Sequence, residues 1–187
     1  MKYGGYGAVQ LAAYIIHKNN IDSYESTRNI INYTKLIKLM YLVERAFILN
    51  CLPTIANDRF VAMDKGPVLS GVLDSIKQTN FMSKDNDIWE EYIERYGIYD
   101  VRLKREIDIL TFSTKHKNIM DAILEEPIKY DYSHLIEYTH KCCPEWNDIF
   151  KNNINMDINI NDILKYSEKT KEEKEEYLRN MELYKNI

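Results

Sequence analysis

Apolar residues recur at helical spacing in two stretches of the first third of the chain. Over residues 8–16 they fall on one face, which predicts an amphipathic helix. Over residues 34–49 they occupy more than one face, so we expect the helix there to be largely buried and to form the centre of the core. Asn32 or Thr34 can cap its first turn by accepting backbone N–H bonds, and Pro53 prevents the helix from continuing.

Two short segments show the alternation in steps of two that is typical of strands. These are residues 59–63 and, less regularly, residues 98–110. Because the rest of the chain is helical, the two segments predict one small sheet or hairpin. We expect Gly66 to turn the chain after the first strand into a helix with Pro67 at its first position, where proline costs no hydrogen bond. Residues 152–161 alternate as well, but asparagine is a poor strand former, so they indicate an extended arm.

Helical spacing returns in the second half of the chain. Ser113 or Thr114 can start one helix, and Ser133 can cap another. Near the C-terminus glutamate and lysine dominate, which predicts a solvated helix whose few apolar residues could dock on a surface. The pattern predicts a mainly α fold, with one compact helical domain and a small sheet over residues 1–167, followed by a charged helical tail over residues 168–187.

Length and charge narrow the classes of partner. With 187 residues, of which 45% are hydrophobic, the chain can bury one core but is short for two domains. Its 29 acidic and 25 basic residues give a net charge of -4, so no bulk attraction to nucleic acid is expected. Lys35, Lys38 and Arg45 are interpreted as the solvated face of their helix and not as a patch for phosphates.

The cysteines and the N-terminal segment indicate the cellular compartment of the protein. Cys51, Cys142 and Cys143 lack the spacing of a disulfide scaffold and fit a reducing cytoplasm. The apolar stretch near the N-terminus is interrupted by Gln10 and His17 and is far shorter than the roughly 20 residues needed to span a bilayer. We therefore expect a cytoplasmic protein with no signal peptide, no membrane anchor and no membrane partner.

Four residues that could bind a metal lie within ten positions of one another: His134, His140, Cys142 and Cys143. Adjacent cysteines seldom bind one tetrahedral ion, and the sequence has no second cysteine pair at zinc-ribbon spacing, so neither a metal nor another cofactor is expected. Cys–His nucleophilic catalysis would need a base and an orienting group, which nothing in the sequence singles out. We expect no catalytic residues and no enzyme.

His140 and the Glu44–Arg45 pair are explained better by a structural role than by a catalytic one. His140 ends one helix just before Pro144 begins the next, and a histidine there can bond free carbonyl groups. Trp146 is expected to pack into the core. Glu44 and Arg45 flank the apolar stripe of the central helix, where they can hold the neighbouring loop by charge-assisted hydrogen bonds.

Three segments carry a recognisable pattern each. Lys35–Arg45 is a helix rich in lysine and leucine, with Tyr-Leu and an acidic-Arg ending. Pro53–Val68 holds an aromatic-Val-Ala-Met strand and a Gly-Pro-Val corner, preceded by Lys65 where an aromatic residue is usual. Leu135–Trp146 holds Thr-His followed by Pro-x-Trp. Taken in this order, the segments resemble the SocA-like Panacea domain family, and the resemblance covers roughly residues 8–167.

The resemblance implies a mostly helical fold with a small sheet and a role in protein binding. Members of the family, in bacteria and their phages, are antitoxins that neutralise toxins, and the founding member is an adaptor that delivers its toxin to an AAA+ protease. We therefore expect the chain to bind a cognate toxin protein. One alternative is an adaptor that recruits an AAA+ protease through the charged tail, and another is an enzyme that uses His140. Association of several copies of the chain stays open.

The contact region is expected at the exposed rim of the first strand and its corner, with two residues of the central helix nearby. Tyrosine and arginine are effective interface anchors, which favours this region. The simpler alternative is that these residues only hold the fold, above all at the Gly-Pro corner. The predicted partner-binding residues are Tyr41, Arg45, Arg59, Asp64, Lys65, Gly66 and Pro67.

Overall fold

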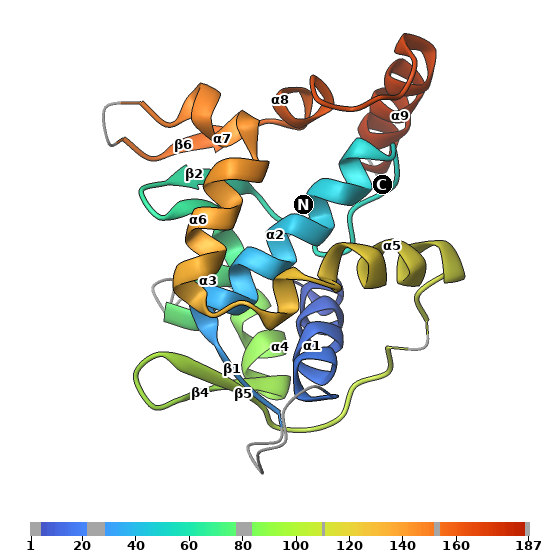
Figure 1. Cartoon of the computed structure of the whole chain (residues 1–187). Helices are drawn as coiled ribbons and strands as arrows, with labels where there is room; N and C mark the ends of the chain where they lie inside the picture. Colours follow the sequence, from blue (N-terminus) through green and yellow to red (C-terminus); the bar gives the residue numbers. More distant parts are fainter. Residues whose placement is uncertain (1–4, 22–28, 78–83, 110, 152–153, 186–187) are drawn as a thin grey trace.

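Helix α2 (Tyr33–Leu49) runs through the middle of the molecule, with the other elements around it (Figure 1). In the computed structural model its side chains from Leu36 to Ile48 are buried almost without interruption, as the apolar spacing predicted. The Asn32 side chain caps the helix by accepting hydrogen bonds from the backbone N–H groups of Thr34 and Lys35. The structure describes residues 5–21, 29–77, 84–109, 111–151 and 154–185.

Helices make up most of the described chain, so the mainly α fold is confirmed. Ser113 caps α5 as predicted, by accepting a hydrogen bond from the His116 N–H. Helix α6 is capped by Asp131 and not by Ser133, because the Asp131 carboxylate reaches the N–H of His134, three residues on. The helices around α2 are α1 (Tyr6–Ile21), α3 (Ser70–Lys77), α4 (Lys84–Tyr92), α5 (Thr114–Leu124), the 3₁₀ helix η1 (Pro127–Lys129), α6 (Tyr132–Cys142), α7 (Pro144–Ile149), α8 (Ile160–Leu164) and α9 (Lys171–Lys185).

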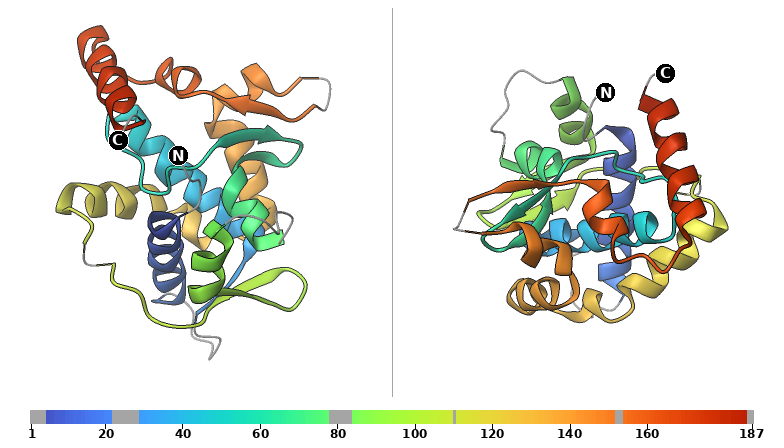
Figure 2. Two further views of the ribbon diagram at one scale, coloured as in Figure 1. Left: turned by 180° about the vertical axis from the view of Figure 1, so that it is seen from behind. Right: turned by 90° about the horizontal axis from the view of Figure 1, so that it is seen from above.

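The strand-like segment predicted over residues 98–110, of which 110 lies outside the described residues, holds one short strand, β5 (Asp100–Leu103). It lies between β1 (Ile30–Asn32) and β4 (Ile93–Tyr96) in an antiparallel sheet. This sheet and α9 lie at opposite ends of the molecule in Figure 1 and in the left view of Figure 2. The segment over residues 59–63 belongs to a second sheet and does not pair with β5. The prediction of one small sheet was therefore wrong, since the described residues form two sheets with different partners.

The second sheet is built on the hairpin of β2 (Phe60–Met63) and β3 (Gly66–Leu69), and with β6 (Met156–Ile158) its order is β3-β2-β6. Strand β2 (Phe60–Met63) confirms the predicted strand, but Gly66 and Pro67 do not begin a helix. They belong to β3 (Gly66–Leu69), which pairs antiparallel with β2 along its whole length. The residues of β3 are all buried, and such a run lacks the alternation that separates a strand from a helix in sequence. Pro67 is tolerated because β3 is an edge strand, and α3 begins at Ser70.

The predicted extended arm contributes the third strand of this sheet. Strand β6 (Met156–Ile158) pairs with β2, with Ile158 opposite Phe60. Ile158 is buried, whereas Met156 is exposed. The strand lies between Asn155 and Asn159 and contains no asparagine itself, so the poor strand propensity of that residue does not oppose the pairing with β2. The arm was predicted over residues 152–161, of which 152 and 153 lie outside the described residues.

Helix α9 is the predicted charged helix near the C-terminus, and it packs on the rest of the chain. Tyr177 is 5% exposed and belongs to the hydrophobic core, and Leu178 and Met181 pack against that core. Leu183 is exposed. Within the described ranges, no helix is long and apolar enough to cross a membrane.

The loop after α2 is held by Glu44. Its Oε1 accepts hydrogen bonds from the backbone N–H groups of Ile55 and Ala56, at 2.9 and 3.2 Å. The carboxyl group is fully buried, and its Oε2 has no hydrogen-bond partner in the described part of the chain. Burial raises the pKa of Glu44 to about 7, although the two backbone hydrogen bonds act to lower it. The expectation that Glu44 and Arg45 both hold this loop is correct for Glu44 alone, because Arg45 turns to Glu145.

Glu44 should make stability depend on pH. Its pKa is higher in the folded than in the unfolded chain, so its contribution to stability is complete below its ordinary pKa of 4.5 and is lost as the pH rises through about 7. In Glu44→Gln, which cannot ionise, we expect the free energy of unfolding to fall less between about pH 5 and pH 8, by roughly 2 kcal/mol. Urea unfolding across this range measures the effect.

The exposed Glu137→Gln variant is the control for this measurement. It should leave the pH profile of stability as in the wild type. The prediction concerns the slope with pH and not the absolute stability, because a glutamine amide would also need a hydrogen-bond partner in place of Oε2. A Glu44→Gln profile parallel to that of the wild type would contradict a buried, titrating carboxyl group.

Candidate functional site

A buried ion pair joins α7 to the central helix. Arg45 donates two hydrogen bonds to Glu145, from Nε to Oε1 at 2.6 Å and from Nη2 to Oε2 at 3.1 Å. The Tyr41 hydroxyl donates to the same Oε1 at 2.8 Å. Glu145 and Tyr41 are fully buried, and burial together with the Glu145 carboxylate raises the pKa of Tyr41. We call this group of three residues the Glu145 junction.

Trp146 joins α7 to the β2–β3 hairpin. Its Nε1 donates a hydrogen bond to the backbone carbonyl of Met63, at the end of β2, at 2.8 Å. The His140 ring stacks on the Trp146 ring, with centroids 4.0 Å apart, and Phe150 stacks close to the same indole. The prediction that the His140 side chain bonds free helix carbonyls was wrong, since its ring stacks on Trp146 and its buried Nε2 has no hydrogen-bond partner among the described residues. Desolvation and the nearby Lys38 lower the pKa of His140.

Lys38 is buried, so its interpretation as part of a solvated face was wrong. Only 1% of the residue is exposed, and its Nζ donates a hydrogen bond to the backbone carbonyl of Pro67 at 3.0 Å. Burial lowers the pKa of this amine to about 7. Gly66 makes the close approach feasible, because a Cβ there would lie 2.8 Å from Nζ and 2.9 Å from Oγ1 of Thr139. Its backbone has a φ of 93°, which favours glycine.

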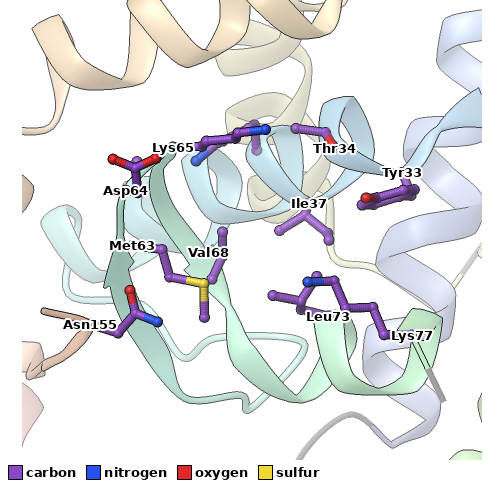
Figure 3. Close-up of a pocket in the computed structure, with 12 residues that line it drawn as sticks. Tyr33, Thr34, Ile37, Met63, Asp64, Lys65, Val68, Leu73, Lys77 and Asn155 are labelled. Atoms are coloured by element: carbon purple, nitrogen blue, oxygen red, sulfur yellow. The ribbon is translucent and has the colours of Figure 1, made fainter. Parts of the chain in front are cut away.

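A cavity of about 330 Å³ lies beside these contacts, between α2, the β2–β3 hairpin and α3. We call it the hairpin cavity. Figure 3 shows the apolar side chain of Ile37, on α2, across from Met63, Val68 and Leu73. Its polar lining includes the side chains of Asp64, Lys65, Lys77 and Lys38.

The predicted partner-binding residues do not form one exposed rim. Tyr41, Gly66 and Pro67 are buried, and the Arg45 side chain is only 15% exposed. Tyr41 therefore belongs to the core, because the face of α2 that carries it is covered by α7 and the hairpin. Whether any of these residues contacts a partner stays a prediction.

Three of the predicted residues are exposed, at two ends of the hairpin. Asp64 and Lys65 form its turn, where they border the hairpin cavity. Arg59 lies at the opposite end, where its guanidinium donates to Ser70 Oγ at 2.9 Å and lies 3.8 Å from Asp157. It borders a different hollow, of about 400 Å³, next to α9. The structure thus separates Arg59 from the residues of the turn.

Sequence reasoning missed Lys38 and the apolar walls of the cavity. One signal was available, because Lys38 lies inside a run with apolar residues on more than one side of the helix. A lysine in such a run is either buried with a partner or interrupts the packing. Nothing in the sequence marks Ile37 and Leu73 as cavity residues, since their helical spacing predicts only that they are buried in the core.

The four residues weighed as metal ligands do not come together. His134 is exposed beside the Asp131 carboxylate, whereas His140 stacks on Trp146. The Cys142 and Cys143 sulfurs lie 3.6 Å apart. In the part of the chain that the structure describes, no group of three or more His, Cys, Asp or Glu side chains could hold a metal ion.

Comparison with known proteins identifies the family. No curated protein and no solved structure matches the chain. A family model described as antitoxin SocA-like, Panacea domain, matches residues 36–147. The match contains the Glu145 junction, the β2–β3 hairpin with Lys38 beneath it, and the stacked His140 and Trp146. It spans more than half of the sequence, and the protein belongs to the SocA-like Panacea domain family of antitoxins.

Proposed function

We propose that the protein is an antitoxin that neutralises a cognate toxin by binding it directly, without catalysis, and that the hairpin cavity and the turn beside it form the contact surface. The observation that carries the proposal is the family match, whose residues include both strands of the hairpin and most of the cavity wall. A protein partner is the function that the family suggests.

The contacts around the cavity favour binding over chemistry. Glu145 is engaged by Arg45 and Tyr41, and the Trp146 indole N–H is engaged by a carbonyl group of β2. These polar groups fix the position of the hairpin relative to α2. A surface that is rigid before binding loses little conformational entropy when a partner docks, which favours affinity.

The chemistry of the surface suits a protein partner. The half-buried Met63 and the small exposed parts of Ile37, Val68 and Leu73 give the concave site an apolar floor, and Lys65 at the turn offers an exposed charge at its edge. A concave apolar centre with a polar rim is the usual anatomy of a protein interface. The charged rim would govern the rate and specificity of association, and the apolar centre most of the affinity.

Co-expression with the protein encoded by the neighbouring gene tests the proposal. We expect that neighbour to stop growth when expressed alone, and this chain to restore growth and to co-purify with it. Lys65→Glu, which reverses a charge at the rim, should weaken the complex by about tenfold. Lys115→Glu, an equally simple change on the exposed surface of α5, should leave it unchanged.

Two outcomes would overturn the proposal. One is a neighbour that is harmless with or without this chain, and the other is restored growth with no complex between the proteins. The amount of toxin in the rescued cells separates sequestration from delivery to an AAA+ protease. Sequestration leaves the toxin level unchanged, whereas an adaptor lowers it in cells that contain the protease.

A further inference from the structure

Lys38 is a buried amine whose charge has no counterpart nearby. An ammonium group has three N–H donors, and among the described residues this one has a single acceptor, the carbonyl oxygen of Pro67. Two buried carboxylates are engaged elsewhere, Glu145 of α7 with Arg45 and Glu44 of α2 with the loop after α2. No ion pair joins Lys38 to a carboxylate of the described residues. Burying an unpaired charge is costly, and its lowered pKa reflects that cost.

The amine lines the hairpin cavity, whose walls are mainly apolar, with polar groups from Tyr33, Thr34 and Asn155 and two further amines. Lys65 lies at the turn and Lys77 on α3, and Figure 3 shows them on different sides of the space. Asp64 is the one carboxylate among the described residues that line it. The lining therefore combines apolar walls with an excess of positive charge. A ligand that complements both features has an apolar body and an anionic group.

We propose that the hairpin cavity is a binding site for a carboxylate on an apolar body, with the carboxylate paired to Lys38. The pair would give Lys38 the acceptors that it lacks, in a site where water is largely displaced and charge-assisted hydrogen bonds are strong. The apolar body would lie against Ile37, Val68 and Leu73. A volume of about 330 Å³ is in the range of small-ligand sites.

The same chemistry has two sources, a free organic acid or the C-terminal carboxylate of another protein chain. The inference stands apart from the proposed function, because a free acid would occupy the cavity with no toxin present. If the neighbouring protein failed to bind and a small carboxylate bound at Lys38, the proposed function would fall and this site would stand.

Hexanoate and hexanol are the probes, since they share an apolar chain and differ in the carboxylate. Titration of the full chain is followed by the methyl resonances of Ile37, Met63, Val68 and Leu73 and by calorimetry. We expect hexanoate to bind about tenfold more tightly than hexanol at pH 6.5. Lys38→Met should abolish that preference and retain hexanol binding, whereas Lys115→Met, on the exposed surface of α5 away from the cavity, should leave the preference unchanged.

The wild-type titration decides the matter even if Lys38→Met does not fold. Hexanoate must then shift the Ile37 and Val68 methyl resonances at concentrations at which hexanol does not. Equal affinity for the two probes, or a preference that persists in a folded Lys38→Met variant, would overturn the proposal.

A pair of peptides identifies the source of the carboxylate. Both end in leucine, one with a free carboxylate and one with an amide. Lys38-dependent binding of the acid alone assigns the site to a chain terminus, and binding of hexanoate but neither peptide assigns it to a free acid. Either result supports the site, whereas equal binding of both peptides at the same methyl groups would argue against recognition of a carboxylate.

Discussion

Replacement of Glu145 by alanine is expected to lower the free energy of unfolding by about 3–5 kcal/mol, the largest effect of any single substitution considered for this protein. The change would leave the Arg45 guanidinium without its two acceptors and the Tyr41 hydroxyl without one. Both groups lie where water cannot replace the lost oxygen atoms, since Tyr41 is fully buried and the Arg45 side chain is only 15% exposed. Urea denaturation at pH 7 measures the loss.

A matched ion pair at the surface provides the control. Arg59 and Asp157 lie 3.8 Å apart with side chains that are 53% and 60% exposed, so Asp157→Ala should cost less than about 1 kcal/mol. The double variant Arg45→Met with Glu145→Ala should be more stable than the sum of the single effects predicts, because it removes the unpaired charge. If Glu145→Ala cost no more than Asp157→Ala, the Glu145 junction would not be the buried contact described here.

The substitution Gly66→Ala should destabilise the fold by roughly 2–4 kcal/mol. A Cβ at this position would lie 2.8 Å from Nζ of Lys38, 2.9 Å from Oγ1 of Thr139 and 3.1 Å from Cδ2 of His140. Lys38 could shift only by giving up its hydrogen bond to the β3 carbonyl, and His140 is held by its stacking on Trp146. The left-handed backbone, with a φ of 93°, adds a cost of its own.

Gly97→Ala separates the two causes. Gly97, between β4 and β5, also has a positive φ, of 67°, but no atom of the described residues lies within 4 Å of its Cβ position. We expect this variant to lose only about 1 kcal/mol, the cost of the backbone conformation. Thermal unfolding of both variants gives the comparison. Equal losses would mean that the crowding around Lys38 adds nothing to the requirement for glycine at position 66.

The helical part of the fold was largely predictable, because helix signals are local. The apolar positions of α2 and its cap at Asn32 lie within one stretch of sequence, and the cap of α5 at Ser113 is just as local. The error at α6 was also local. Asp131 and Ser133 are both good capping residues, and the structure decides between them through the N–H group that each can reach.

The sheets were harder, because a strand is stabilised by partners distant in sequence. The pairing of β2 with β6 joins residues near position 60 to residues near position 157, and β3 is too short and too apolar to alternate. A short apolar run after glycine and proline fits a helix start as well as an edge strand. Only the hydrogen bonds with β2 separate the two interpretations.

In the candidate site, too, some features were predictable from the sequence and others were not. The exposed turn at Asp64 and Lys65 was predictable, because these residues lie between the predicted strand and the Gly-Pro corner. Burial of Lys38 did not, because a charged residue in a helical run is usually assigned to the solvated side. The contact with the Pro67 carbonyl, 29 residues away, is what makes burial of this amine tolerable.

The sequence by itself determined the buried central helix, the mainly α fold and, through three motifs in order, the family. The tertiary structure alone decided that the first two motifs line one cavity and that the third packs against them, with Arg45 joined to Glu145 across 100 residues of chain. The physical reason is that periodicity and capping act within a few turns of backbone. The partner of a buried charge, in contrast, is set by which surfaces pack together when the whole chain folds.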